Sequence, residues 1–105
     1  MTFKVITLCG STKFKNEFVN VSQKLTLQGS IVLMPHIFNH GDSLNLSMDQ
    51  LAMLVELHKE VVSMADEIFV IDVGGYVGDS TNNEIKYAIN LGKIVRYYSK
   101  EFENQ

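Results

Sequence analysis

Apolar residues follow two different periods along this chain, and the two periods alternate. Short, nearly continuous apolar runs are typical of buried strands, and they occupy residues 3–8, 30–34, 68–71 and 94–98. Between these runs, apolar residues recur at the spacing of an amphipathic helix, in segments 13–28, 47–64 and 81–92. The pattern therefore predicts the element order βαβαβαβ.

This alternation predicts an α/β three-layer sandwich, in which helices cover both faces of a parallel sheet. We expect four or five strands in the order of about 2-1-3-4, because right-handed crossovers then place the first helix opposite the others. Ligands of such folds bind where the sheet reverses direction, beyond the carboxyl ends of the strands. The loops expected to meet there are residues 9–13 and 73–84.

Composition limits the class of protein. The 105 residues, of which 46% are hydrophobic, suffice for one core and predict a single domain over residues 1–105. A net charge of −3 gives no sign of the basic face that nucleic-acid binding needs. The sequence shows neither a signal peptide nor an apolar stretch long enough to span a membrane. We therefore expect a cytoplasmic protein that binds neither nucleic acid nor membrane.

The first loop has the composition of an anion-binding turn at a helix start. Gly10 allows a tight turn and the close approach of a ligand. Ser11 and Thr12 offer hydroxyls and free amides, and Lys13 adds a positive charge. Together with Cys9, which has the character of a small buried residue, they are candidate substrate-binding residues. The alternative is that Ser11 or Thr12 only caps the first helix.

The second loop is rich in glycine and polar side chains. Three glycines in five residues follow a buried strand, which implies an exposed backbone that a ligand approaches. An aspartate ends that strand at the edge of the sheet where ligands bind, and two hydroxyl residues precede the next helix. The candidate substrate-binding residues here are Asp72, Gly74, Gly75, Gly78, Ser80 and Thr81.

Glu84 is the candidate catalytic group. The pattern Thr81-Asn82-Asn83-Glu84 predicts a helix start with Glu84 about three residues inside it, where the helix dipole keeps a carboxylate ionised at neutral pH. An ionised carboxylate beside a sugar is the usual nucleophile at a glycosidic bond. The alternative is that Glu84 only completes a capping box with Thr81.

The three histidines leave other possibilities open. His58 lies on the apolar stripe of the second helix, either as a core or interface residue or as a group in the cleft that protonates a leaving group. His36 and His40 lie in the loop 35–46, which is either a lid or a simple connection. Because no cysteine cluster accompanies them, we expect no metal. Cleavage of a glycosidic bond by a carboxylate nucleophile needs no cofactor, so we expect no other cofactor either.

The second helix is more apolar than one narrow stripe against a small sheet requires. Its apolar residues are Met48, Leu51, Leu54, Val55, Leu57, Val61 and Val62. We therefore expect a homo-oligomer, most simply a homodimer, in which a second copy covers part of this helix.

Three segments together resemble the nucleoside 2-deoxyribosyltransferase superfamily. They are Ile6-Thr7-Leu8-Cys9-Gly10-Ser11-Thr12, then Ala65-Asp66-Glu67-Ile68-Phe69-Val70-Ile71, then Ser80-Thr81-Asn82-Asn83-Glu84-Ile85-Lys86-Tyr87-Ala88 continuing to Leu91-Gly92-Lys93. The resemblance implies a Rossmann-like or flavodoxin-like fold, and cleavage or transfer at the N-glycosidic bond of a 2-deoxynucleoside or its 5′-monophosphate. It also implies that Glu84 is the nucleophile and that Gly10 and Ser11 bind a 5′-phosphate.

The chain also differs from that family. Many members carry an aspartate eight residues before the one that precedes the third strand, and counting back from Asp66 gives His58 here. The glycine-rich turn before Glu84 is more similar to the turn of cytokinin-activating phosphoribohydrolases, a second candidate activity. In relatives a C-terminal segment completes the neighbouring subunit's site, and we expect this segment to be reduced here to residues 98–105, with the tail from Ser99 frayed. A non-catalytic nucleotide-binding module and a purely structural domain remain as alternatives.

Overall fold

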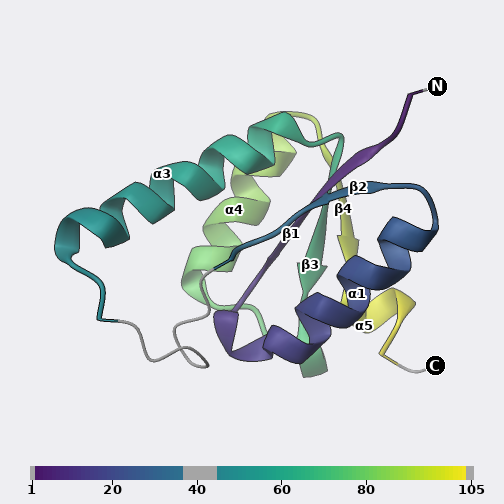
Figure 1. Ribbon diagram of the computed structural model, residues 1–105, viewed down its shortest axis with the longest axis horizontal. Coiled ribbons are helices and arrows are strands. Elements are labelled where there is room, and N and C mark those ends of the chain that lie inside the picture. Colours follow the sequence, from purple (N-terminus) through teal and green to yellow (C-terminus); the bar gives the residue numbers. More distant parts are fainter. Residues whose placement is uncertain (1, 37–44, 104–105) are drawn as a thin grey trace.

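The computed structural model describes residues 2–36 and 45–103 (Figure 1). Its strands are β1 (Val5–Gly10), β2 (Ile31–Leu33), β3 (Glu67–Ile71) and β4 (Ile94–Tyr97). Its helices are α1 (Lys15–Leu27), α3 (Met48–Met64), α4 (Asp79–Asn90) and α5 (Tyr98–Glu101), with 3-10 turns η1 (Thr12–Phe14) and η2 (Val73–Gly75). Residues 37–44 of the expected loop, His40 among them, lie outside the described residues. Across the described ranges, no helix is both long and apolar enough to cross a membrane.

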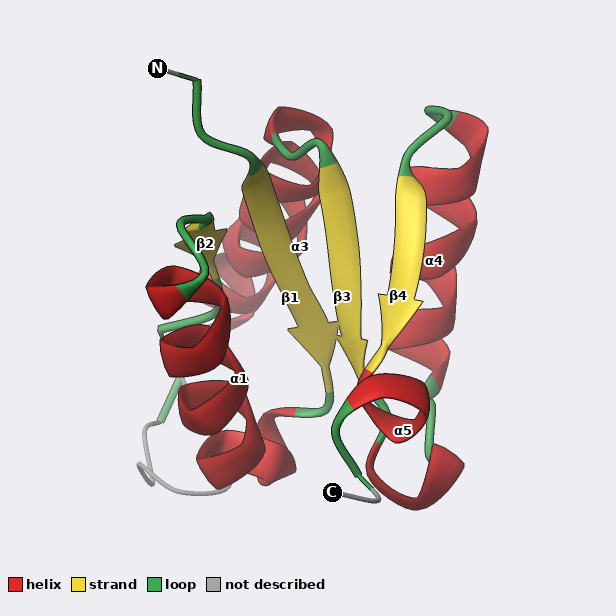
Figure 2. Cartoon of the chain, turned by 90° about the vertical axis from the view of Figure 1, so that its right-hand side faces the viewer, coloured by secondary structure: helices red, strands yellow, loops and turns green. Residues whose placement is uncertain are grey.

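The strands form one four-stranded, all-parallel sheet in the order β2-β1-β3-β4, which confirms the predicted α/β fold. β1 and β3 pair over five residues and end side by side at Gly10 and Ile71. β2 pairs with the other edge of β1, and β4 with the other edge of β3. The loops that follow β1 and β3 therefore emerge together at one end of the sheet (Figure 2).

Each face of the sheet carries its own core. On one face, α1 packs Phe18, Val21 and Leu25 against alternate residues of β1 and β3. On the other face, α3 and α4 bury Val62, Ile85 and Ala88 against the remaining residues of these strands. All five residues of β3 are buried, as expected for a central parallel strand that is covered on both sides.

Helix α3 is exposed over much of its length. Its start is as the sequence predicts, because Ser47 and Gln50 form both hydrogen bonds of a capping box. Toward its C-terminal end it buries Val62. Its first half extends past the sheet (Figure 1), and apolar side chains on it remain about half exposed or more, including Met48, Met53, Val55 and Leu57. The homodimer stays a prediction.

The start of α4 corrects one expectation. The helix begins at Asp79 with Gly78 as its N-cap, and not at Thr81. Thr81 is buried inside the first turn, so it cannot cap the helix. Glu84 consequently lies in the second turn, and the capping box between Thr81 and Glu84 does not form.

The C-terminal tail is ordered where we expected it to fray. β4 ends at Tyr97, and α5 follows directly. The backbone N–H and the hydroxyl of Ser99 both donate to the carboxylate of Asp72, at 2.9 and 2.6 Å. Phe102 stacks on Phe69 with ring centroids 5.5 Å apart. Asp72 is buried, and a buried carboxylate needs donors; the tail supplies them.

Candidate functional site

A cavity of about 320 Å³ opens where β1 ends and α4 begins. We call it the loop cavity. It brings together Gly10 and Ser11 from the first predicted loop with Gly78, Ser80 and Thr81 from the second. The start of an α-helix with free amides and the hydroxyls of two serines can hold a sugar hydroxyl or an anion.

Gly10 has a steric reason to be glycine. Its φ is +155°, and a Cβ at this position would lie 2.9 Å from the backbone oxygen of Ile71. A side chain here would therefore push β1 away from β3 at the edge where the cavity begins.

Glu84 reaches the wall of the loop cavity from the second turn of α4. Its side chain is 16% exposed. Burial raises the pKa of this carboxyl to about 7, where the sequence predicted that the helix start would keep it ionised. The prediction fails because the helix dipole acts within the first turn, which Glu84 does not occupy, while the loss of solvation remains.

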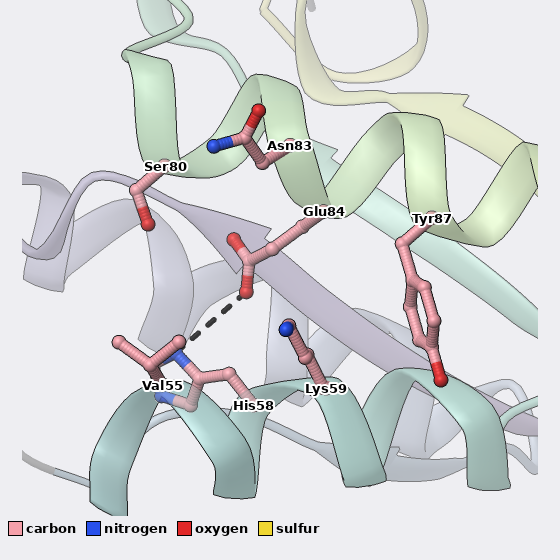
Figure 3. A pocket seen from close by; sticks show the side chains of 7 residues that line it. All are labelled: Val55, His58, Lys59, Ser80, Asn83, Glu84 and Tyr87. Atoms are coloured by element: carbon pink, nitrogen blue, oxygen red, sulfur yellow. Dashed lines mark ion pairs between the residues drawn. The ribbon is translucent and has the colours of Figure 1, made fainter. Parts of the chain in front are cut away.

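His58 faces Glu84 from α3 (Figure 3). Its Nδ1 lies 3.6 Å from Oε2 of Glu84, and its side chain is about one-third exposed. Burial lowers the pKa of His58, so the same loss of solvation disfavours the charged form of both partners. His58 thus lies in the cleft and not in the core. Its role at an interface or in proton transfer stays a prediction.

A second cavity, of about 530 Å³, lies between α3 and α4 (Figure 3). We call it the inter-helix cavity. Its lining residues are Val55, His58, Lys59, Ser80, Asn83, Glu84 and Tyr87. The carboxyl of Glu84 therefore borders two cavities, the loop cavity and this one.

A third cavity, of about 540 Å³, is mostly apolar and lies between α3 and the end of β2. We call it the apolar cavity. Its walls include Met34, Leu54 and Val61. It shares His58 and Ser80 with the loop cavity, so a flat apolar group in it would lie next to a ligand in the loop cavity.

Three residues of the first loop serve the fold. Cys9 is buried in the core beside α4, and burial raises the pKa of its thiol well above the usual value. The hydroxyl of Ser11 accepts from the backbone N–H of Lys13 at 3.4 Å, so Ser11 caps η1 as well as lining the cavity. The ammonium of Lys13 lies over the ring of Tyr76, 3.8 Å from its centroid. Thr12 does line both the loop cavity and the apolar cavity.

Two of the predicted residues of the second loop bind the C-terminal tail, and a third closes the turn beside them. Asp72 accepts both hydrogen bonds from Ser99. The N–H of Gly74 donates to the carboxylate of Glu103 at 2.7 Å, and Gly75 closes the turn by donating to the backbone oxygen of Asp72. These contacts within the protein account for the polar and glycine-rich composition of the segment, and no ligand is needed to explain it.

Other residues that line the cavities were not among the site residues predicted from the sequence. Tyr76 and Asp79 line the loop cavity, and Lys59, Asn83 and Tyr87 line the inter-helix cavity. Asn83 and Tyr87 have a detectable signal, since they flank Glu84 at positions that share one side of α4. For Tyr76 the only signal in the sequence is that an aromatic side chain lies within a glycine-rich turn.

Metal ligation finds no support in the described residues. Among them no group of three or more His, Cys, Asp or Glu side chains is placed to hold an ion. His36 lines the apolar cavity. The possible partner His40 belongs to the segment that the structure does not describe.

Comparison with known proteins adds no relative. No protein-family model matches this chain, and a search of curated proteins finds no match. The resemblance drawn from the three sequence segments therefore stays a prediction.

Proposed function

We propose that this protein cleaves or transfers the N-glycosidic bond of a 2-deoxynucleoside or its 5′-monophosphate, with Glu84 as the nucleophile. One observation carries the proposal. A largely buried carboxyl borders a cavity that contains the hydroxyls of Ser11 and Ser80 and the start of α4, and it faces an imidazole 3.6 Å away. The resemblance of the three segments to deoxyribosyltransferases agrees with this assignment.

The reaction follows from these two side chains. An ionised Glu84 attacks the anomeric carbon while the bond from that carbon to the base nitrogen breaks, through an oxocarbenium-like transition state. The electron pair of the broken bond goes to the base, which takes a proton from His58. A glycosyl ester on Glu84 results. Water or a second base then attacks the same carbon, gives its proton to His58 and releases the Glu84 carboxylate.

The cavities suggest how the substrate lies. The sugar fits the loop cavity, where Ser11 and Ser80 can bind its hydroxyls or a 5′-phosphate. A nucleophile attacks the face of the sugar opposite the leaving base. The base then lies away from Glu84, and the apolar cavity, which shares His58 with the loop cavity but is not lined by Glu84, suits a flat aromatic group.

The protonation of the pair determines the active pH range. Glu84 and His58 must together hold one proton. Because burial raises the pKa of Glu84 and lowers that of His58, this proton lies mainly on Glu84 and must pass to His58 before Glu84 can attack and the base can leave. The pKa of Glu84 is about 7, so above this pH the pair loses its shared proton. Release of the base is then expected to fall as pH rises through about 7.

The test is the release of free base from a panel of deoxynucleosides, their 5′-monophosphates and the matching ribonucleotides, followed by chromatography. We expect release from deoxy substrates by the wild-type protein and a loss of at least about 100-fold in Glu84→Gln, since the nucleophile is gone. Glu60→Gln is the matched control, because Glu60 is exposed on α3 and lines none of the three cavities.

Three outcomes would contradict the proposal. Undiminished release in Glu84→Gln would exclude Glu84 as nucleophile. Intact nucleotide that co-elutes with the wild-type protein, without release of base, would favour the non-catalytic binding module. Release from ribonucleotides alone would favour a phosphoribohydrolase.

A further inference from the structure

The C-terminal segment 98–103 holds the turn that forms one wall of the loop cavity. Two of its residues bind this turn directly: Ser99 through both of its donors to Asp72, and Glu103 through the N–H of Gly74. The turn lies 27 to 29 residues earlier in the chain. These contacts are therefore tertiary and link the end of the chain to the site.

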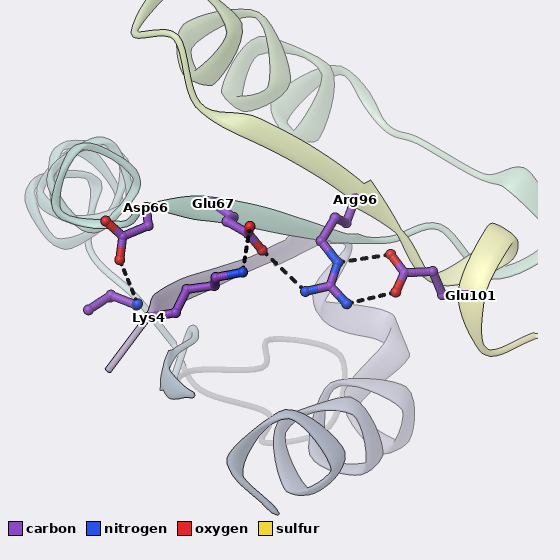
Figure 4. Close-up of polar contacts among 6 residues, drawn as sticks. Lys4, Asp66, Glu67, Arg96 and Glu101 are labelled. Atoms are coloured by element: carbon purple, nitrogen blue, oxygen red, sulfur yellow. Dashed lines mark hydrogen bonds and ion pairs between the residues drawn. The ribbon is translucent and has the colours of Figure 1, made fainter. Parts of the chain in front are cut away.

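The segment is itself fixed to the sheet. Arg96 in β4 donates two hydrogen bonds to Glu101, at 2.9 and 2.7 Å, and a third to the buried Glu67 at 3.2 Å (Figure 4). Lys4 completes the cluster with an ion pair to Glu67. A bidentate guanidinium–carboxylate contact fixes orientation as well as distance, and the stacking of Phe102 on Phe69 adds an apolar contact. The carboxylate of Glu103 is thus presented from a rigid support.

The turn needs such support. Gly74 and Gly75 have φ values of +62° and +81°, a conformation that glycine adopts without strain but at a high cost in backbone entropy. Two backbone hydrogen bonds close the turn, from Gly75 to Asp72 and from Tyr76 to Val73. The charged hydrogen bond from Gly74 to Glu103, at 2.7 Å, is a further restraint from outside the turn.

The turn sets the position of Tyr76, the residue that follows it. The ring of Tyr76 packs edge-on against Phe14, with centroids 6.0 Å apart, and carries the ammonium of Lys13 on its face. Its hydroxyl lies close to the N-cap of α4, since a Cβ added at Gly78 would be 3.4 Å from it. Tyr76 and Gly78 both line the loop cavity.

We propose that Glu103 is a positioning residue of the loop cavity: it fixes the turn 72–76 and so holds Tyr76 as the wall against which the sugar end of the substrate binds. The identity of this ligand rests on the function proposed above. Glu103 lines none of the three cavities, so its effect acts through the turn. Its loss should weaken substrate binding and leave the chemistry at Glu84 largely intact.

The experiment compares Glu103→Ala, Glu103→Gln and the surface control Glu60→Ala. For Glu103→Ala we expect KM for base release to rise roughly fivefold, the effect of one lost hydrogen bond, while kcat changes less than about twofold. Glu103→Gln keeps an oxygen that can accept from Gly74 and should restore most of the loss. Amide hydrogen exchange is the second readout, because Gly74 and Tyr76 should exchange faster in Glu103→Ala while the amides of β3 do not.

The outcomes separate this inference from the function on which it rests. Absence of base release in the wild-type protein overturns the function, whatever Glu103 does. Unchanged exchange at Gly74 and Tyr76 in Glu103→Ala overturns the positioning role alone. Faster exchange with an unchanged KM overturns it as well, since the turn would then move without consequence for the ligand.

Discussion

Replacement of Glu84 by glutamine should stabilise the protein, and increasingly so as pH rises. The folded state raises the pKa of this carboxyl from 4.5 to about 7 because burial disfavours the charged form. Between these two pH values, the folded protein binds a proton that the unfolded chain does not. Below pH 4.5, Glu84 therefore does not reduce the free energy of unfolding of the wild-type protein. This stability is lost as pH rises through about 7.

The size of the effect follows from the same two values. A rise in pKa from 4.5 to about 7 corresponds to a loss of about 3 kcal/mol in the free energy of unfolding once pH exceeds 7. The side chain is 16% exposed, so water screens little of this cost. Glutamine resembles the protonated carboxyl in shape and carries no charge. The loss is large against the roughly 5–15 kcal/mol of a typical domain.

Urea denaturation of the wild-type protein and Glu84→Gln at several pH values between 5 and 8 measures this difference. Near pH 5 the two midpoints should nearly coincide, and at pH 8 the variant should unfold at a urea concentration higher by roughly 2 M. His58 has a lowered pKa and acts in the opposite sense, but it is present in both proteins and largely cancels in the difference. A gap between the two midpoints that does not grow with pH would refute the burial argument for Glu84. Glu60→Gln, which removes a carboxyl exposed on α3, is the matched control.

Two further predictions concern the partners. Light scattering at micromolar concentration should give the mass of a homodimer, and Leu57→Glu, which places a charge on the exposed apolar side of α3, should give a monomer; a monomeric wild-type protein would contradict the expectation. A paired titration should show tighter binding of a deoxynucleoside 5′-monophosphate than of the free deoxynucleoside, because Ser11 and the start of α4 face one cavity. Equal affinities would mean that Ser11 serves only as a cap for η1.

The sheet could be predicted from sequence because its signals are local. Each buried strand is a short apolar run, and the parallel order follows from the helices between the strands and the handedness of crossovers. The capping box of α3 is equally local, since Ser47 and Gln50 contact each other within one turn. Residues at the ends of β1 and β3 could therefore be placed at one cavity without knowledge of any tertiary contact.

The start of α4 and the role of Asp72 could not be predicted in this way. Thr81 and Glu84 match a capping box in spacing, but Gly78 caps the helix without a side-chain hydrogen bond and so leaves no polar signal. Asp72 lies at the edge where ligands bind, yet its donors come from Ser99, 27 residues later. Nothing in the polar sequence of the tail indicates that Ser99 provides the hydrogen-bond donors for the buried carboxylate of Asp72.

The energetics of Glu84 also bear on the choice between a catalytic and a purely structural domain. A capping glutamate would stabilise α4, but the helix begins before Thr81 and leaves Glu84 no such role. In its ionised form the carboxyl weakens the fold, and the histidine that faces it has a lowered pKa and so offers little compensating charge. A neutral residue of the same size would serve the fold better. A group that costs stability at the wall of a cavity is typical of an active site, which supports the assignment of Glu84 as the reacting group.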